Sequence, residues 1–133
     1  MDSAFPNNTY HLPVYRKALE IFKISRAIAA YFSDDKHVIE MDFSANPQHY
    51  QAGSLVTESL QLAPGIASAA CAPNSESRLQ RVKNIRAVAK NLKHLCRKLE
   101  GCGVKEVEFL NLLRKEIHLF DKMVSDWFQN NKT

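Results

Sequence analysis

The residues with the clearest chemical direction are basic. Between Arg78 and Lys98 the chain carries eight Lys or Arg residues and no acidic residue, and this density of positive charge indicates an anionic partner. At about 100° per residue, five of these side chains share an arc of about 80° on one helix and extend over about 21 Å. The five candidate nucleic-acid-binding residues are Lys83, Arg86, Lys90, Lys93 and Arg97. Such a ridge can follow several phosphates, and no aromatic residue is interleaved among the cations to stack on bases.

Two other interpretations of this ridge stay open. Helical runs of Lys and Arg usually form a solvated face. The ridge could also meet acidic side chains of a neighbouring subunit. The candidates for such contacts are Glu100, Glu106, Glu108 and Glu116.

The sequence gives little evidence for an enzyme active site or a metal site. The chain has no Gly-rich phosphate loop, no Gly-x-Ser-x-Gly motif and no His-Glu-x-x-His motif. His94, Cys96 and Cys102 could be read as metal ligands, but structural zinc sites place cysteine pairs two to four residues apart. We interpret them as buried thiols and a surface histidine.

Glu58 resembles the inward carboxylates of di-iron bundles, but no Glu-x-x-His pair accompanies it. We interpret it as a carboxylate that faces outward or accepts a hydrogen bond. The sequence thus predicts no catalytic residue, no metal site and no cofactor.

The composition is that of an ordinary globular domain. The 133 residues are 45% apolar and 24% charged, with a formal net charge of +4, which excludes a disordered chain and predicts a single domain over residues 1–133. Three cysteines cannot all pair within one chain and no signal peptide precedes them, so we expect a reducing, cytoplasmic compartment. The weakly charged stretch Gly53–Ala72 contains Glu58 and Pro64, and is therefore interpreted as a core segment rather than a membrane span.

Helical periodicity predicts four helices and hence an all-α, antiparallel up-down-up-down four-helix bundle. A frayed tail over residues 1–9 precedes them, and a long loop over residues 33–52 joins the first two. The predicted helices run from about Leu12 to Phe32, from Gly53 to Ala72, from an N-cap at Asn74 or Ser75 to Leu99, and from Val104 to Gln129.

The predicted core follows from the spacing within these helices. The second helix is apolar almost all round and should be the most buried, and Pro64 predicts a kink near Leu60. The third helix has an inward face of Val82, Ile85, Ala89, Leu92, Cys96 and Leu99, and the fourth has one of Leu110, Leu113, Ile117, Phe120, Val124 and Trp127. The phenylalanines at 109, 120 and 128 also have core spacing.

Two segments carry a family resemblance. Residues 12–21, Leu-Pro-Val-Tyr-Arg-Lys-Ala-Leu-Glu-Ile, resemble the start of the 23S rRNA intervening-sequence proteins, the four helix bundle protein family, whose first helix typically begins Leu-x-Val-Trp-x-x-Ala; Tyr15 stands where the Trp usually is. Residues 62–67, Leu-Ala-Pro-Gly-Ile-Ala, are similar to the family's Ile-Pro-Ala-Asn-Ile-Ala segment. The resemblance covers about residues 10–128. The usual Asn and the Glu-Gly after that segment are replaced by Gly65 and by Ser68-Ala69-Ala70, and the loop over 33–52 is longer.

The resemblance implies a bundle that assembles as a ring, commonly a pentamer. Some members of the family are encoded inside rRNA intervening sequences. A related bundle, the accessory variability protein of diversity-generating retroelements, binds nucleic acid and a reverse transcriptase. By resemblance we expect a non-enzymatic, ring-forming accessory factor that binds RNA or DNA, with a reverse transcriptase as a further partner and no membrane. The alternative is a scaffold or protein-interaction bundle with no nucleic-acid role.

Surplus apolar surface predicts self-association. The first two helices carry wider apolar arcs than one bundle core consumes, and Phe109, Leu112 and Phe128 flank the inward face of the fourth. Exposed apolar patches of this kind mark interfaces. We expect light scattering at micromolar concentration to report a homo-oligomer, and a mass near the 15.1 kDa of one chain would contradict this.

Overall fold

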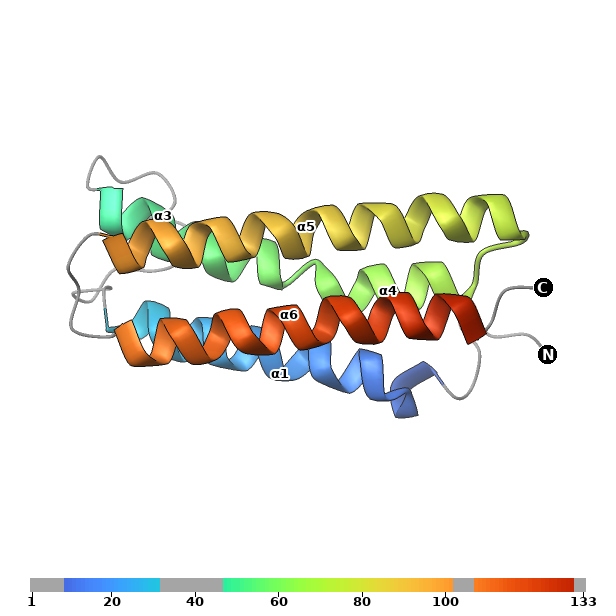
Figure 1. Ribbon diagram of the computed structural model, residues 1–133, viewed down its shortest axis with the longest axis horizontal. Helices are drawn as coiled ribbons and strands as arrows, with labels where there is room; N and C mark the ends of the chain where they lie inside the picture. Colours follow the sequence, from blue (N-terminus) through green and yellow to red (C-terminus); the bar gives the residue numbers. More distant parts are fainter. Residues whose placement is uncertain (1–8, 32–46, 102–106, 131–133) are drawn as a thin grey trace.

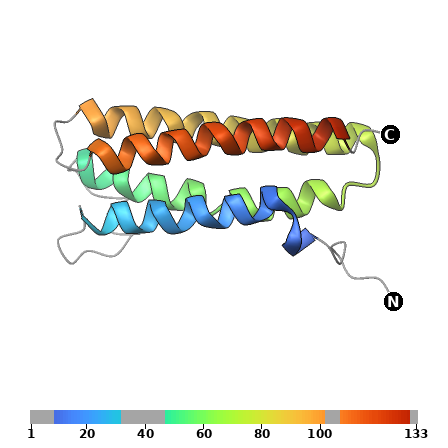
Figure 2. The ribbon, with the colours of Figure 1, turned by 60° about the horizontal axis from the view of Figure 1, so that its bottom comes forward.

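The chain forms a bundle of four helical arms (Figures 1 and 2). The computed structural model describes residues 9–31, 47–101 and 107–130. Its elements are a short 3-10 helix, η1 (Thr9–His11), and the α-helices α1 (Pro13–Ala30), α3 (Pro47–Ser59), α4 (Leu62–Ala70), α5 (Ser75–Gly101) and α6 (Val107–Asn130). Helices α3 and α4 together form one interrupted arm, and the colour order in Figure 1 shows that successive arms run in opposite directions. The predicted all-α four-helix bundle is confirmed.

The contacts between helices fix which arms are neighbours. Helix α5 packs against α6 on one side and against α3 and α4 on the other, and α1 packs against the same three helices. Helices α1 and α5 therefore lie at opposite corners of the bundle. As a result, among the described helices, α6 and the α3–α4 arm are the partners that can line a groove beside α5.

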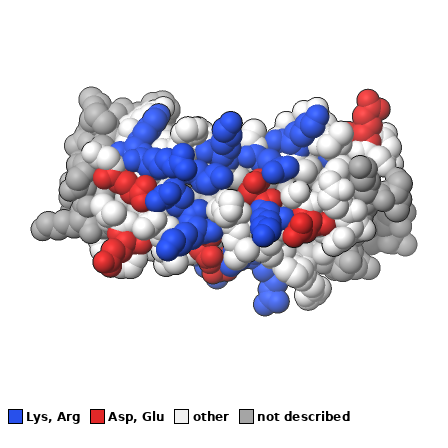
Figure 3. Space-filling view, viewed as in Figure 1, with Lys and Arg blue, Asp and Glu red and all other residues white. Residues whose placement is uncertain are grey.

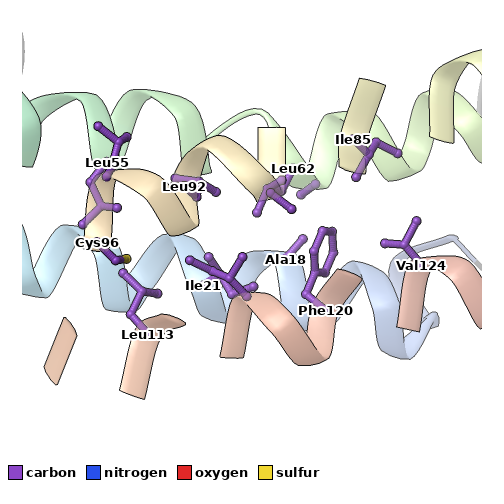
Figure 4. Close-up of a cluster of buried hydrophobic side chains, with 14 of the residues drawn as sticks. Ala18, Ile21, Leu55, Leu62, Ile85, Leu92, Cys96, Leu113, Phe120 and Val124 are labelled. Atoms are coloured by element: carbon purple, nitrogen blue, oxygen red, sulfur yellow. The ribbon is translucent and has the colours of Figure 1, made fainter. Parts of the chain in front are cut away.

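The core runs along the centre of the bundle and receives side chains from all four arms (Figure 4). Ile21 of α1, Leu62 of α4, Leu92 of α5 and Phe120 of α6 are completely buried there. Burying a large apolar side chain of this kind contributes about 1.5–3 kcal/mol. All six predicted inward residues of α5 are buried, so its helical face was predicted correctly.

The inward face of α6 departs from the prediction at its last turn. Leu110 to Val124 follow the predicted pattern, but Phe128 is buried and Trp127 is only half-buried. A straight α-helix drifts by about 20° per heptad relative to a strict seven-residue repeat, so a step of four residues from Val124 restores the inward direction. Phe109, predicted to pack in the core, is 51% exposed.

The first described residue and the start of α3 also correct the prediction. Thr9, assigned to a frayed tail, begins η1 and is buried. The predicted loop over residues 33–52 ends early, because α3 starts at Pro47. Proline lacks the N–H that the first helical position leaves unused, so Pro47 opens a helix within the segment that we expected to be a loop. The rest of that loop, and the tail over residues 1–8, lie outside the described residues.

The start of α5 follows the prediction. The backbone N–H of Ser77 donates to Oδ1 of Asn74 at 2.7 Å, which makes Asn74 the N-cap. The helix ends at Gly101, two residues beyond the predicted Leu99. Cys102 and Gly103 lie beyond the described part of the chain.

Pro64 interrupts the second arm at Leu60 and Gln61, and the predicted kink is confirmed. Without an N–H on Pro64, the carbonyl of Leu60 has no helical donor. The chain continues through a turn in which the N–H of Gln61 donates to the carbonyl of Glu58 at 3.0 Å. This break leaves Leu60 exposed, but among the described residues the second arm still has the largest buried share of the four arms, as predicted.

Close packing explains why residue 65 is glycine. A Cβ built at Gly65 would lie 2.9 Å from Cγ1 of the buried Ile85, whereas a Cβ at Gly101 would meet nothing within 4 Å. Alanine is favoured over glycine in a helix by about 1 kcal/mol, but overpacking costs about 1–3 kcal/mol.

We therefore expect Gly65→Ala to lower the free energy of unfolding by about 1 kcal/mol, because the overpacking at Ile85 outweighs the gain in helix propensity. The matched control is Gly101→Ala, which should cause no loss of stability. Urea unfolding followed by circular dichroism measures both. A Gly65→Ala variant that is as stable as Gly101→Ala would contradict the close approach.

Candidate nucleic-acid interface

The five predicted cations lie along the border that α5 shares with α6 (Figure 3). Lys83, Arg86, Lys90 and Arg97 are exposed, and Lys93 is half-buried. Two adjoining hollows lie on this border. The first is lined by Lys83, Arg86, Ala87, Lys90, Lys93 and Asp121, and the second by Lys93, Arg97, Arg114, Lys115 and His118. We call the two hollows together the basic groove.

Helix α6 supplies residues that the sequence analysis missed. Arg114, Lys115 and His118 form the second wall of the groove, opposite Lys93 and Arg97. Their spacing places them beside the inward face of α6, but the sequence alone does not say which neighbouring helix they border. The arrangement of the arms brings them to α5 rather than to α1.

Asp121 pairs with one of the predicted cations. Nε of Arg86 donates to Oδ1 of Asp121 at 2.9 Å, and Nη2 donates to Oδ2 at 3.3 Å. This hydrogen-bonded, opposite charge raises the pKa of Arg86 above its ordinary value. The charge of Arg86 is thereby largely offset by a carboxylate on the same chain.

A second carboxylate lies at the other hollow. Nη2 of Arg114 donates to Oε1 of Glu100 at 3.3 Å and to Oδ1 of Asn111 at 2.8 Å. Arg114 is therefore also held by its own chain. Both Asp121 and Glu100 reduce the positive charge of the groove at defined points.

The remaining cations of the groove have no acidic partner within the described residues, and they are unevenly distributed. Lys83 stands alone, seven residues and about 10 Å along the helix from Lys90, with the paired Arg86 between them. The others gather around Lys93, which lines both hollows. We call this group the Lys93 cluster; it consists of Lys90, Lys93, Arg97 and Lys115.

Two further basic residues of α5 have a structural role. Nη1 of Arg81 donates to the carbonyl of Ser68 at 2.8 Å, and Nε of Arg78 donates to the carbonyl of Ala69 at 3.2 Å. These carbonyls lie in the last turn of α4, where the helix dipole favours positive charge. Arg78 and Arg81 thus serve the fold, and the basic groove accounts for most of the other cations in the run.

Among the described residues, no Phe, Tyr or Trp side chain lines either hollow. Two of the aromatic residues that the structure describes, Tyr31 and Phe109, stack on each other across the border of α1 and α6, with ring centroids 6.0 Å apart. The groove therefore offers mainly ammonium and guanidinium donors, which suit phosphate oxygens, and no Phe, Tyr or Trp ring on which a base could stack.

Among the described residues, those that the sequence suggested as metal ligands do not form a metal site. Cys96 is buried, and its burial, followed by the charge of Glu100, raises the pKa of its thiol to about 12. His94 is exposed, as predicted, and Cys102 lies outside the described residues. The amide of Asn91 on α5 donates to both carboxylate oxygens of Glu58, which confirms the interpretation of Glu58 as a hydrogen-bonded group.

Two further properties concern the described part of the chain as a whole. Among residues 9–31, 47–101 and 107–130, no three His, Cys, Asp or Glu residues form a group that could hold a metal ion. None of the helices in those ranges is both long enough and apolar enough to cross a membrane.

Comparison with protein-family models, with curated proteins and with solved structures gives no match to this chain. The resemblance to the intervening-sequence proteins therefore stays a prediction from residues 12–21 and 62–67. The basic groove is therefore the feature of the described structure that bears on function.

The raised pKa of Cys96 predicts an unreactive thiol. With a pKa of about 12, only about one thiol in 10,000 is ionised at pH 8, and the thiolate is the reactive form. We expect iodoacetamide to leave Cys96 unmodified in the native protein and to label it in guanidinium, as peptide mapping by mass spectrometry would show. Equal labelling rates in the two conditions would refute the buried environment.

Proposed function

We propose that this protein binds nucleic acid through phosphate contacts in the basic groove between α5 and α6, without regard to base sequence. The observation that carries the proposal is the Lys93 cluster, in which cations from two helices converge with no acidic partner among the described residues. Contacts of this type position a nucleic acid but carry no sequence information.

The energetics of α5 support a ligand over a merely solvated face. Lys90, Lys93 and Arg97 follow one another at spacings of three and four residues, where like charges destabilise a helix by about 0.2–0.5 kcal/mol per pair. A solvated helix commonly alternates charge sign at these spacings, but residues 78–98 contain no acidic residue. An anionic ligand would remove the repulsion that the protein retains.

The proposal extends to assembly and location. In a ring, each subunit would repeat the groove and multiply the attraction for a polyanion. The ring, its pentameric form and a reverse transcriptase as partner are supported only by the resemblance of residues 12–21 and 62–67. A non-enzymatic accessory role in a reducing cytoplasm completes the proposal, in keeping with the buried Cys96 thiol.

A scaffold role is the second candidate, and one observation favours it. Phe109 and Leu112 of α6 are 51% and 52% exposed, and the neighbouring Tyr31 at the end of α1 is 60% exposed. An apolar surface of this kind is typical of an interface between proteins. It lies on the border of α1 and α6, away from the basic groove, so both functions can be tested separately.

Charge removal in the cluster tests the proposed function. We expect Lys90→Gln combined with Lys93→Gln to weaken binding about tenfold or more at low salt, and to reduce the dependence of log K on log salt by about 1.8, since each phosphate contact contributes about 0.9. The matched control is Arg16→Gln combined with Lys23→Gln, which removes the same charge from exposed positions on the opposite helix α1. Fluorescence anisotropy with a labelled oligonucleotide measures both, and equal losses in the two variants would count against the groove.

Removing the acidic partner of Arg86 should have the opposite effect on the affinity for nucleic acid. Asp121→Asn removes a carboxylate and leaves Arg86 available for phosphate, so binding should become about threefold tighter or more. An exposed ion pair of this kind contributes only about 0.2–1 kcal/mol to stability, so the fold should persist, which a thermal melt would verify. Weaker binding by Asp121→Asn would contradict a phosphate contact at this position.

A further inference from the structure

The unpaired cations of the basic groove lie on two helices. Lys90, Lys93 and Arg97 extend over about 10 Å of α5, and Lys115 lies across the groove on α6, where Arg114 is held by Glu100. Packed helices have axes about 8–10 Å apart, so the positive patch is nearly as wide as it is long. A ligand that matches it presents phosphates to both helices.

A duplex presents phosphates in this way. Its two backbones flank a minor groove about 6 Å wide, a separation that long side chains from adjacent helices can address. A single strand carries one line of phosphates, whereas a duplex can present a separate backbone to each wall of the groove.

The described lining of both hollows contains no Phe, Tyr or Trp, which points in the same direction. Sites for single strands gain much of their affinity from bases that stack on aromatic side chains. In a duplex the bases already stack on one another, so a surface that supplies only cations can satisfy it. A duplex also releases more counterion per phosphate contacted than a single strand does.

The two acidic residues limit the length of close contact. Asp121 interrupts the ridge between Lys83 and Lys90, so a flexible strand that followed all of α5 would meet a carboxylate along its path. The backbones of a duplex wind through a full turn in about 10 base pairs, and a straight protein surface meets each of them only over a short stretch. A short positive patch therefore suits a duplex.

From these observations we infer that the ligand of the basic groove is double-stranded nucleic acid, held at the Lys93 cluster by phosphates of both strands. This inference rests on the proposed function and specifies its substrate class. Duplex DNA and duplex RNA share the required chemistry, because both present paired phosphate backbones.

Three probes test the inference by fluorescence anisotropy: a labelled DNA duplex of about 16 base pairs, an RNA duplex of the same sequence, and an oligothymidylate of the same length, which does not pair with itself. We expect the better-bound duplex to have a dissociation constant about tenfold or more below that of the single strand at about 100 mM salt. Comparison of the DNA duplex with the RNA duplex shows which of the two nucleic acids is the better ligand.

Single substitutions on the two walls test whether both helices contact the duplex. Lys90→Gln on α5 and Lys115→Gln on α6 should each weaken duplex binding by about threefold or more, and both residues are exposed, so the fold should be unaffected. Lys23→Gln on α1 is the matched control and should leave binding unchanged within about twofold.

The outcomes separate the inference from the proposed function. A single strand bound as tightly as the duplexes would overturn the inference and leave phosphate binding in place. Loss with Lys90→Gln but not with Lys115→Gln would overturn contact with both walls. Failure of all three probes to bind would overturn the proposed function itself, and the inference with it.

Discussion

The packing of α5 against α6 determines which charges the molecule can present together. Leu92 of α5 and Phe120 of α6 are completely buried in the same core, and the packing of the two helices around this core sets the position of every side chain along their shared border. A shift of one helical turn would move the cations about 5 Å and would separate Arg86 from Asp121. The apolar core thus fixes the pattern of charge on the surface, although none of the described charged residues is buried in it.

Much of the fold was predictable from the sequence, because the inward faces of α5 and α6 keep a regular spacing and the burial of apolar side chains is the main force that stabilises a bundle. The errors fall where one local rule competes with another. Pro47 was assigned to the loop over residues 33–52, whereas proline suits the first turn of a helix. Trp127 was favoured over Phe128 because a strict heptad ignores the drift of a straight helix.

Only the α5 side of the candidate site was predictable from the sequence. The ridge on α5 follows from helical geometry, since all five cations lie on one stretch of chain. The contribution of Lys115 and His118, the pairing of Arg86 with Asp121 and the isolation of Lys83 depend on contacts between helices that are distant in sequence. A helical periodicity can say which side chains share a face, but it does not say which other face lies beside it.

The Arg78 and Arg81 contacts have a consequence for the order of folding. Helix α4 has nine residues and no side-chain hydrogen bond at its N-cap, and its last carbonyls are bound by side chains of α5. An isolated helix shorter than about 12 residues is not stable in water. Helix α4 should therefore form only after the first turns of α5 exist, and the two should open together as one cooperative unit in native-state hydrogen exchange.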